Sequence, residues 1–303
     1  MICFIGQQNV FADGEETIRR LKGVDINAKQ IERVCHHYGD EIEKQDYSLI
    51  KEGYLCEYET QKANQTHYVM IDGAMYLTRE DKWKEAKLGR IFCAEDNVRI
   101  SSQRSIISNS TYVSHLGSIN QFFPKLEYHI DGLKSIVIIA DGATWIWNWA
   151  DDFYPDATQI LDFFHAKEHL CEFAINYFKD KKHRSLWIDR QCKVLLEDDV
   201  GKVIEVLKNL PISNNKKIEE QKNKLINYYK KNDKRMKYSI FIKRGLLIGS
   251  GAIESAHRNV LQQRMKLSGQ HWTKKGFQQI ANLRTTYKSN NSNRIRELVK
   301  NAA

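Results

Sequence analysis

Three acidic side chains stand where they could bind metal ions together. Asp72 in "VMIDGA" and Asp141 in "IIADGA" each end a short apolar run and precede a glycine. Such a run predicts a buried strand, and glycine lets the backbone turn sharply after the Asp. In open α/β sheets ligands bind at the carboxyl ends of the strands, so both carboxylates are expected there, on adjacent strands. Each Asp alone is also compatible with a simple turn or helix cap.

Glu254 is the expected third member of this set. It lies in the first turn of a helical pattern that follows "GSG" at residues 249–251. A Glu there also suits the helix dipole, by roughly 0.3–1 kcal/mol, which is the structural alternative. Three carboxylates supply hard oxygen ligands, which suit Mg²⁺ or Mn²⁺. Two such ions about 3.5–4 Å apart activate water and stabilise the leaving oxygen in phosphoryl transfer.

The helical pattern after Glu254 is strongly basic, because Glu297 is the only later acidic residue. Ile253, Ala256 and Val260 form its expected core stripe. The neighbouring face is expected to hold a phosphate backbone, and one aromatic ring to stack on bases. The residues predicted to contact DNA are His257, Arg258, Arg264, Lys266, Trp272, Lys274 and Lys275.

Composition agrees with a polyanionic partner. The 303 residues carry a net charge of +9 with a sequence pI of about 9.1, and the excess is concentrated after Lys179. A solvated lysine-rich surface is the alternative reading. There is no apolar run of about 18 residues, so no membrane span is expected. The six cysteines form no CxxC pair, which suits reduced thiols in a cytosol.

The rest of the chain predicts an α/β fold with added helices. Residues 14–45 read as two short helices, broken at Gly23 and restarted with Asn27 as the cap, like a helix-turn-helix or a plain helical hairpin. Apolar strands separated by helices then predict a sheet covered on both faces. The expected segments are residues 1–50, an N-terminal helical part; 51–170, the first part of the core; 171–248, a basic helical insertion; and 249–303, the helix of Glu254 with a basic tail.

The order Asp, Asp, helical insertion, Glu resembles the DDE transposases, which have an RNase H-like core. More narrowly, "GSGAIESAHRNVLQQRMKLSGQHWTKKGFQQIANLR" and "IIADGATWIW" look like blocks of the ISKra-type insertion-sequence transposases, related to the Mutator-like group. The resemblance implies an RNase H-like mixed sheet, with Asp72, Asp141 and Glu254 as the catalytic triad and two Mg²⁺ or Mn²⁺ ions. Asp162 and His165 in "DFFH" resemble a D-x-x-H element outside that triad.

The resemblance further implies cleavage and transfer of double-stranded DNA, at transposon ends and target, by a homo-oligomer near the bacterial nucleoid. Members of that family have a longer N-terminal region. A truncated or decayed transposase that only binds DNA is therefore the alternative. A remote alternative is a zinc peptidase, since "HAKEH" places His165, Glu168 and His169 in an H-x-x-E-H pattern.

Overall fold

The computed structural model describes residues 1–53, 64–101, 104–212 and 215–301. The chain divides into two compact units, each described here by itself. Unit 1 comprises residues 1–136 and 252–303, and unit 2 comprises residues 137–251. Unit 2 is therefore inserted in the sequence of unit 1.

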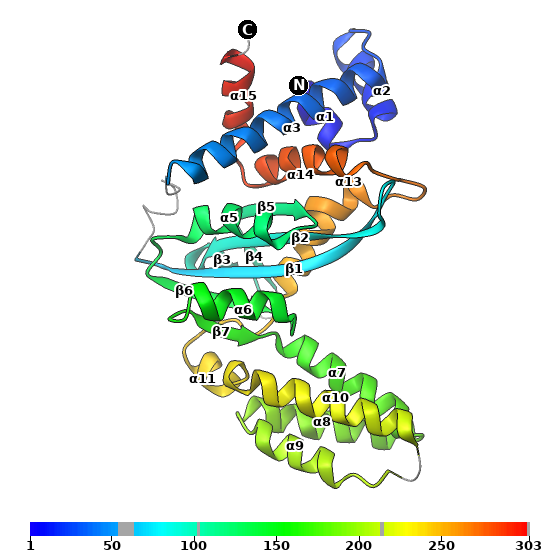
Figure 1. Cartoon of the computed structure of the whole chain (residues 1–303), viewed down its shortest axis with the longest axis vertical. Coiled ribbons are helices and arrows are strands. Elements are labelled where there is room, and N and C mark those ends of the chain that lie inside the picture. Colours follow the sequence, from blue (N-terminus) through cyan, green and yellow to red (C-terminus); the bar gives the residue numbers. More distant parts are fainter. Residues whose placement is uncertain (54–63, 102–103, 213–214, 302–303) are drawn as a thin grey trace. The chain divides into compact units, whose positions relative to one another are not determined.

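Unit 1 contains most of the sheet and the helices nearest both ends of the sequence (Figure 1). Its strands are β1 (Thr66–Thr78), β2 (Lys82–Cys93), β3 (Asn97–Arg99), β4 (Ser105–Ile107) and β5 (Thr111–Leu116). Its helices are α1 (Ile2–Gln8), α2 (Phe11–Lys22), α3 (Ala28–Lys51), η1 (Ala94–Asp96), α5 (Ile119–Ile130), the π-helical turn η3 (His257–Gln262), α13 (Gln263–Met265), α14 (Lys274–Lys288) and α15 (Ser292–Asn301). The helix α12 (Gly251–Ala256) begins at the boundary between the units.

Unit 2 begins within a strand and is otherwise mostly helical. Its strands are β6 (Ser135–Ala140) and β7 (Thr158–Leu161). Its helices are α6 (Thr144–Phe153), α7 (Phe163–Tyr177), α8 (Lys181–Leu196), α9 (Val200–Asn209), α10 (Lys216–Asn232), η2 (Asp233–Arg235) and α11 (Tyr238–Lys243). The five longer strands form a mixed sheet in the order β5-β2-β1-β6-β7, and β3 pairs with β4. The predicted α/β class is confirmed at this level.

The helices α2 and α3 are separated where the sequence predicts, although together they extend beyond residues 14–45 and α1 precedes them. Gly23 ends α2 with φ of 62°, a left-handed conformation that glycine adopts without strain. Asn27 caps α3: its side chain accepts from the Gln30 amide, and the Gln30 side chain accepts from the Asn27 amide. A DNA-reading role for these helices stays a prediction.

The first predicted strand does not end at Asp72, and that expectation is wrong. β1 continues to Thr78, because β2 runs antiparallel to it and pairs with it from His67 opposite Cys93 through to Thr78 opposite Lys82. Gly73 does not form a turn, because it lies within β1. A side chain there would collide with the carboxylate of Glu85 from β2.

Helix α14 joins the N-terminal helices to the sheet. It lies against both α3 and the edge strand β5 (Figure 1), and it is buried from Gly276 to Thr286. Gly39 of α3 meets the backbone of Gln279 so closely that a side chain would not fit. Gln278 donates to the Ser114 carbonyl at 3.1 Å and accepts from the Leu116 amide at 2.9 Å. The side-chain amide of Gln278 thus makes the hydrogen bonds to β5 that a neighbouring strand would otherwise make at this edge.

The described residues between 171 and 248 contain helices and no strand, as the sequence predicts. Helices α7, α8, α9 and α10 pack against one another. Their core includes Leu195, Val203, Leu207 and Tyr229, which are fully buried. The Tyr229 hydroxyl donates to the Ala166 carbonyl at 2.9 Å.

None of the helices in the described part of the chain combines the length and the apolar character that a membrane crossing requires. Five of the six cysteines are free thiols. The sixth, Cys56, lies outside the described residues.

Candidate metal-binding carboxylates

Two of the predicted acidic residues lie at neighbouring strand ends of unit 2. β6 and β7 are parallel, and their last residues, Ala140 and Leu161, are register partners. Asp141 and Asp162 follow directly, and the Asp162 amide donates to the Ala140 carbonyl at 2.9 Å. The expected position of Asp141 at a strand end is confirmed. Its Oδ1 accepts from the Ala143 amide at 2.9 Å, so the carboxylate also forms the turn into α6.

Asp162 is fully buried and connects the end of β7 to the Gly-Ser-Gly segment. Its carboxylate caps α7 by accepting from the Phe164 amide at 2.7 Å, and it accepts a short hydrogen bond from the Ser250 hydroxyl. A side chain on Gly249 would come within 2.6 Å of the Phe164 ring. The segment four residues before Glu254 is therefore fixed by Asp162, which explains the glycine and the serine in this stretch.

His165 lies beside Asp162 on the first turn of α7. Its Nε2 is 3.9 Å from the Asp162 Oδ2, and its Nδ1 is 3.3 Å from the Glu168 Oε2. One turn further on, the Nδ1 of His169 is 3.5 Å from the Glu172 Oε2. Both imidazoles of the H-x-x-E-H pattern thus face acidic residues of their own helix, and His165 also lies near Asp162.

Tyr228 of α10 is a residue near Asp141 that sequence reasoning missed. Its ring occupies the space that a side chain on Gly142 would need. Burial, followed by the Asp141 and Asp162 carboxylates, raises the pKa of Tyr228, so the phenol stays protonated at neutral pH. No spacing in "NYYKK" relates this tyrosine to a residue 87 positions earlier, so only the fold reveals it.

Asp72 has its own partner in unit 1. Its Oδ1 accepts from the Gly73 amide at 2.7 Å, and its Oδ2 lies 3.6 Å from the Nε2 of His257. The same Nε2 is 3.2 Å from the Asp72 carbonyl oxygen. Burial lowers the pKa of His257 and the Asp72 charge opposes that shift. A neutral ring with its proton on Nε2 donates to the Asp72 carbonyl and holds this part of β1 in place.

His257, Arg264 and Trp272 do not lie on a surface that DNA could reach, which corrects the expected strip. Their exposed fractions are 2%, 1% and 9%. Ile253, Ala256 and Val260 are buried as predicted, but the buried stripe is wider. It also takes in Leu261, because positions three and four residues apart share one helix face.

Arg264 is part of the core of unit 1. Its guanidinium carbon lies 4.9 Å from the centre of the Phe11 ring and 5.1 Å from that of Trp272. Its Nε donates to the Gly6 carbonyl at 3.3 Å, and burial lowers its pKa to about 10. This arginine holds α1 and α2 against the turn that follows α13.

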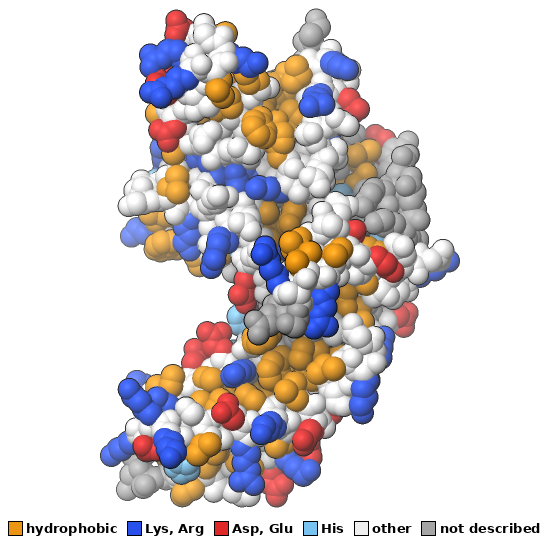
Figure 2. Space-filling view, turned by 180° about the vertical axis from the view of Figure 1, so that it is seen from behind, with side chains coloured by type: hydrophobic (Ala, Val, Ile, Leu, Met, Phe, Trp, Pro, Cys, Tyr) orange, Lys and Arg blue, Asp and Glu red, His pale blue; other side chains and the backbone are white. Residues whose placement is uncertain are grey.

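The basic residues that remain exposed are Arg258, Lys266, Lys274 and Lys275. Lys274 is 3.1 Å from Asp81, and Lys275 is 3.2 Å from Asp40, so two of the four are in surface ion pairs. In Figure 2, Lys and Arg side chains are spread over both units with Asp and Glu among them. The prediction of a phosphate-binding strip is therefore reduced to these four cations.

The carboxylates present suit hard divalent cations. The Asp72 side chain is 29% exposed, Asp141 is half-buried and Glu254 is exposed. Asp72 and Glu254 belong to unit 1 and Asp141 to unit 2. Accessible carboxylate oxygens are the ligands that Mg²⁺ and Mn²⁺ prefer. Asp162, by contrast, is fully buried, and its carboxylate accepts hydrogen bonds from the Phe164 amide and the Ser250 hydroxyl.

Comparison with known proteins gives a family and no activity. No curated protein matches the chain. A family model described as "Uncharacterised protein family (UPF0236)" matches residues 42–302, which is most of the sequence and includes Asp72, Asp141, Asp162 and Glu254. The chain belongs to this family, UPF0236.

Proposed function

We propose that this protein is a transposase that cleaves and joins DNA strands with the help of divalent metal ions. Asp72, Asp141 and Glu254 are the proposed metal ligands. One observation carries the proposal: Asp141 and Asp162 end two paired parallel strands, and Asp162 holds the Gly-Ser-Gly segment from which the helix of Glu254 starts. Two of the acidic positions that the sequence singled out, Asp141 and Asp162, thus follow neighbouring strand ends within unit 2.

The bound ions would polarise the scissile phosphate and lower the pKa of a coordinated water. Residues of the chain hold the proposed ligands in position. Asp72 is held through its backbone by His257, and Asp141 by the turn into α6. Tyr228 covers the backbone beside Asp141 with a protonated phenol, which adds no charge to compete with the carboxylates. The exposed cations Arg258 and Lys266 would contact the DNA backbone.

The test is a strand-cleavage assay with the full chain and double-stranded DNA that contains the sequences flanking its gene. Cleavage or joining is expected with Mg²⁺ or Mn²⁺, and none with EDTA. Asp141→Asn should abolish the reaction while leaving DNA binding and folding intact, because it keeps the size of the side chain and removes its charge. Asp152→Asn is the matched control, since Asp152 is an exposed aspartate of the adjacent helix α6.

Two other outcomes would replace the proposal. DNA binding without cleavage under any metal would indicate a DNA-binding protein derived from a transposase. Zinc-dependent peptide cleavage that is lost in Glu168→Gln would indicate the peptidase. The pairing of His165 with Glu168 and of His169 with Glu172 gives the second outcome little structural support.

A further inference from the structure

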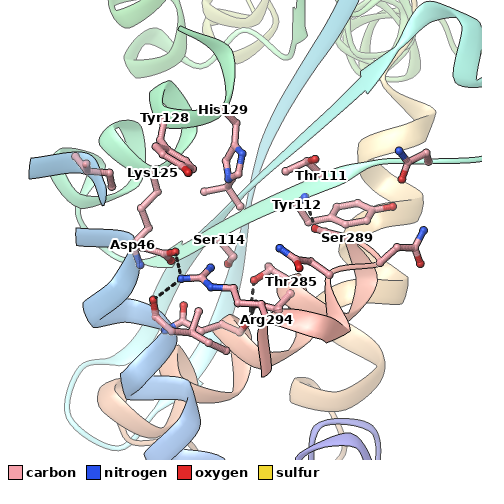
Figure 3. Close-up of a pocket in the computed structure, with 18 residues that line it drawn as sticks. Asp46, Thr111, Tyr112, Ser114, Lys125, Tyr128, His129, Thr285, Ser289 and Arg294 are labelled. Atoms are coloured by element: carbon pink, nitrogen blue, oxygen red, sulfur yellow. Dashed lines mark hydrogen bonds and ion pairs between the residues drawn. The ribbon is translucent and has the colours of Figure 1, made fainter. Parts of the chain in front are cut away.

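Unit 1 contains a cavity away from all the carboxylates discussed above. Its volume is about 400 Å³, and its walls come from α3, β5, α5, α14 and the start of α15 (Figure 3). Small-molecule sites commonly measure about 300–1,000 Å³. The lining is unusual in being mostly polar and uncharged. It includes Asn109, Thr111, Tyr112, Ser114, Tyr128 and His129.

The charged side chains of the cavity are already paired within its walls. Arg294 lies 2.7 Å from Asp46 (Figure 3). Its Nε also donates to Gln45 at 3.0 Å. Lys125 lies 2.9 Å from Glu43 and is buried. A charged ligand would compete with one of these pairs for its partner and so would gain less from the charged side chains than if they were unpaired. The cavity therefore suits a neutral ligand.

Two buried polar groups at the cavity have no hydrogen-bond partner among the described residues. Ser114 is 4% exposed and its Oγ is unpaired, and the Nδ1 of His129 is unpaired as well. Burial, and then the charge of Arg294, lowers the pKa of His129 to about 4, so its ring is neutral at pH 7. An unpaired buried polar group costs about 1–3 kcal/mol. A bound ligand with donors and acceptors would remove that cost.

The hydroxyl groups of α14 and of the residue after it define what such a ligand must offer. Thr285 and Thr286 donate to carbonyls of their own helix, so their oxygens are left as acceptors. Ser289 accepts from the Tyr112 amide at 2.8 Å, so its own proton is left to donate. This wall thus offers a ligand two hydroxyl acceptors and one hydroxyl donor.

We propose that this cavity binds a nucleobase. A base is neutral, carries alternating donors and acceptors on its edge, and has a flat face that Tyr112 or Tyr128 could stack against. The base comes either from a free nucleoside or from a nucleotide rotated out of a DNA strand. The proposal does not depend on DNA cleavage, because neither source requires the carboxylates of the metal site.

The first experiment titrates the full chain with adenosine, guanosine, cytidine and thymidine in a calorimeter. At least one nucleoside is expected to bind with a Kd of about 1 mM or tighter, and free ribose is not. Ser114→Ala should weaken binding about threefold to tenfold, the effect of one neutral hydrogen bond. It should leave the protein at least as stable as before, because the Ser114 hydroxyl has no hydrogen-bond partner to lose.

Ser110→Ala is the matched control. Ser110 is 7% exposed, but its hydroxyl accepts from the Arg90 Nε at 2.9 Å and it does not line the cavity. This change should lower stability and leave nucleoside affinity unchanged. Equal affinities for Ser114→Ala and Ser110→Ala would overturn the proposal, as would binding of ribose in preference to every nucleoside.

The second experiment identifies the source of the base. Duplex DNA with 2-aminopurine at successive positions is mixed with the protein, and a fluorescence rise reports a base that has left the stack. A rise that is lost in Ser114→Ala, without binding of free nucleosides, assigns the cavity to a rotated DNA base. Binding of free nucleosides without a rise assigns it to a small molecule. Failure of both experiments rejects the nucleobase.

Discussion

Arg264 and Arg258 are six residues apart and are expected to behave in opposite ways. Arg264→Ala removes a buried guanidinium between Phe11 and Trp272 and should lower the free energy of unfolding by about 2–3 kcal/mol. Arg258→Ala changes an exposed side chain and should alter stability by less than about 0.5 kcal/mol. Urea unfolding of the two variants measures both effects.

The same two variants also distinguish an arginine that belongs to the core from one that is proposed to contact DNA. Arg258→Ala should reduce the slope of log affinity against log salt for duplex DNA by about 0.9, the share of one phosphate contact. Stable Arg264→Ala protein with a flattened salt slope would show that Arg264 leaves the core to bind DNA.

Glu254→Gln tests whether this exposed carboxylate serves catalysis or only the start of its helix. Removing a negative charge beside exposed cations should hold or tighten metal-free DNA binding, while cleavage is lost. Gel-shift titration without metal and the cleavage assay measure the two properties separately. Loss of folding with no separate effect on chemistry would identify Glu254 as a helix-start residue.

At the scale of elements, local signals predicted the helices well. Asn27 with Gln30, and Gly23 in the left-handed conformation, set helix ends through contacts between near neighbours in the sequence. The continuation of β1 past Asp72 to Thr78 could not be predicted, because it depends on β2 as a partner. The burial of Arg264 required knowing that aromatic rings from residues 11 and 272 meet there.

In the candidate site, too, a local feature could be predicted from the sequence and the long-range contacts could not. Asp141 at a strand end was predictable from an apolar run followed by Asp-Gly. The contacts of His257 with Asp72 and of Tyr228 with Gly142 span large sequence separations. Such contacts leave no periodic pattern in a single sequence.

Ser250→Ala tests the connection between β7 and the helix of Glu254. The change leaves the fully buried Asp162 carboxylate with one hydrogen bond fewer and should cost about 1.5–3 kcal/mol, the value for a bond to a charged group. Ser255→Ala, at an exposed position of the same helical segment, is the control and should cost less than about 0.5 kcal/mol. Thermal unfolding compares them, and equal stabilities would show that the Ser250 contact is not needed.

For the molecule as a whole, buried neutral histidines predict a loss of stability in acid. Burial lowers the pKa of both His115 and His129 to about 4 from an ordinary value of 6.5. Between these values the unfolded chain binds protons that the folded chain excludes, so stability is full above pH 6.5 and falls as the pH drops towards 4. Urea unfolding at several pH values should show this fall, and His129→Gln should make it shallower. A flat profile between pH 6.5 and 4 would contradict the assigned burial.

The insertion of unit 2 into the sequence of unit 1 sets an order of events during synthesis. Helix α3 is translated early, yet the helix that covers it, α14, ends at Lys288. At about 5–20 residues per second, a ribosome takes roughly 8–30 s to pass from residue 136 to the end of α14. Through that interval the apolar face of α3 and the edge of β5 stay uncovered, and all of unit 2 is made before the interval ends. A nascent chain thus contains Asp72 and Asp141 well before the ribosome reaches Glu254.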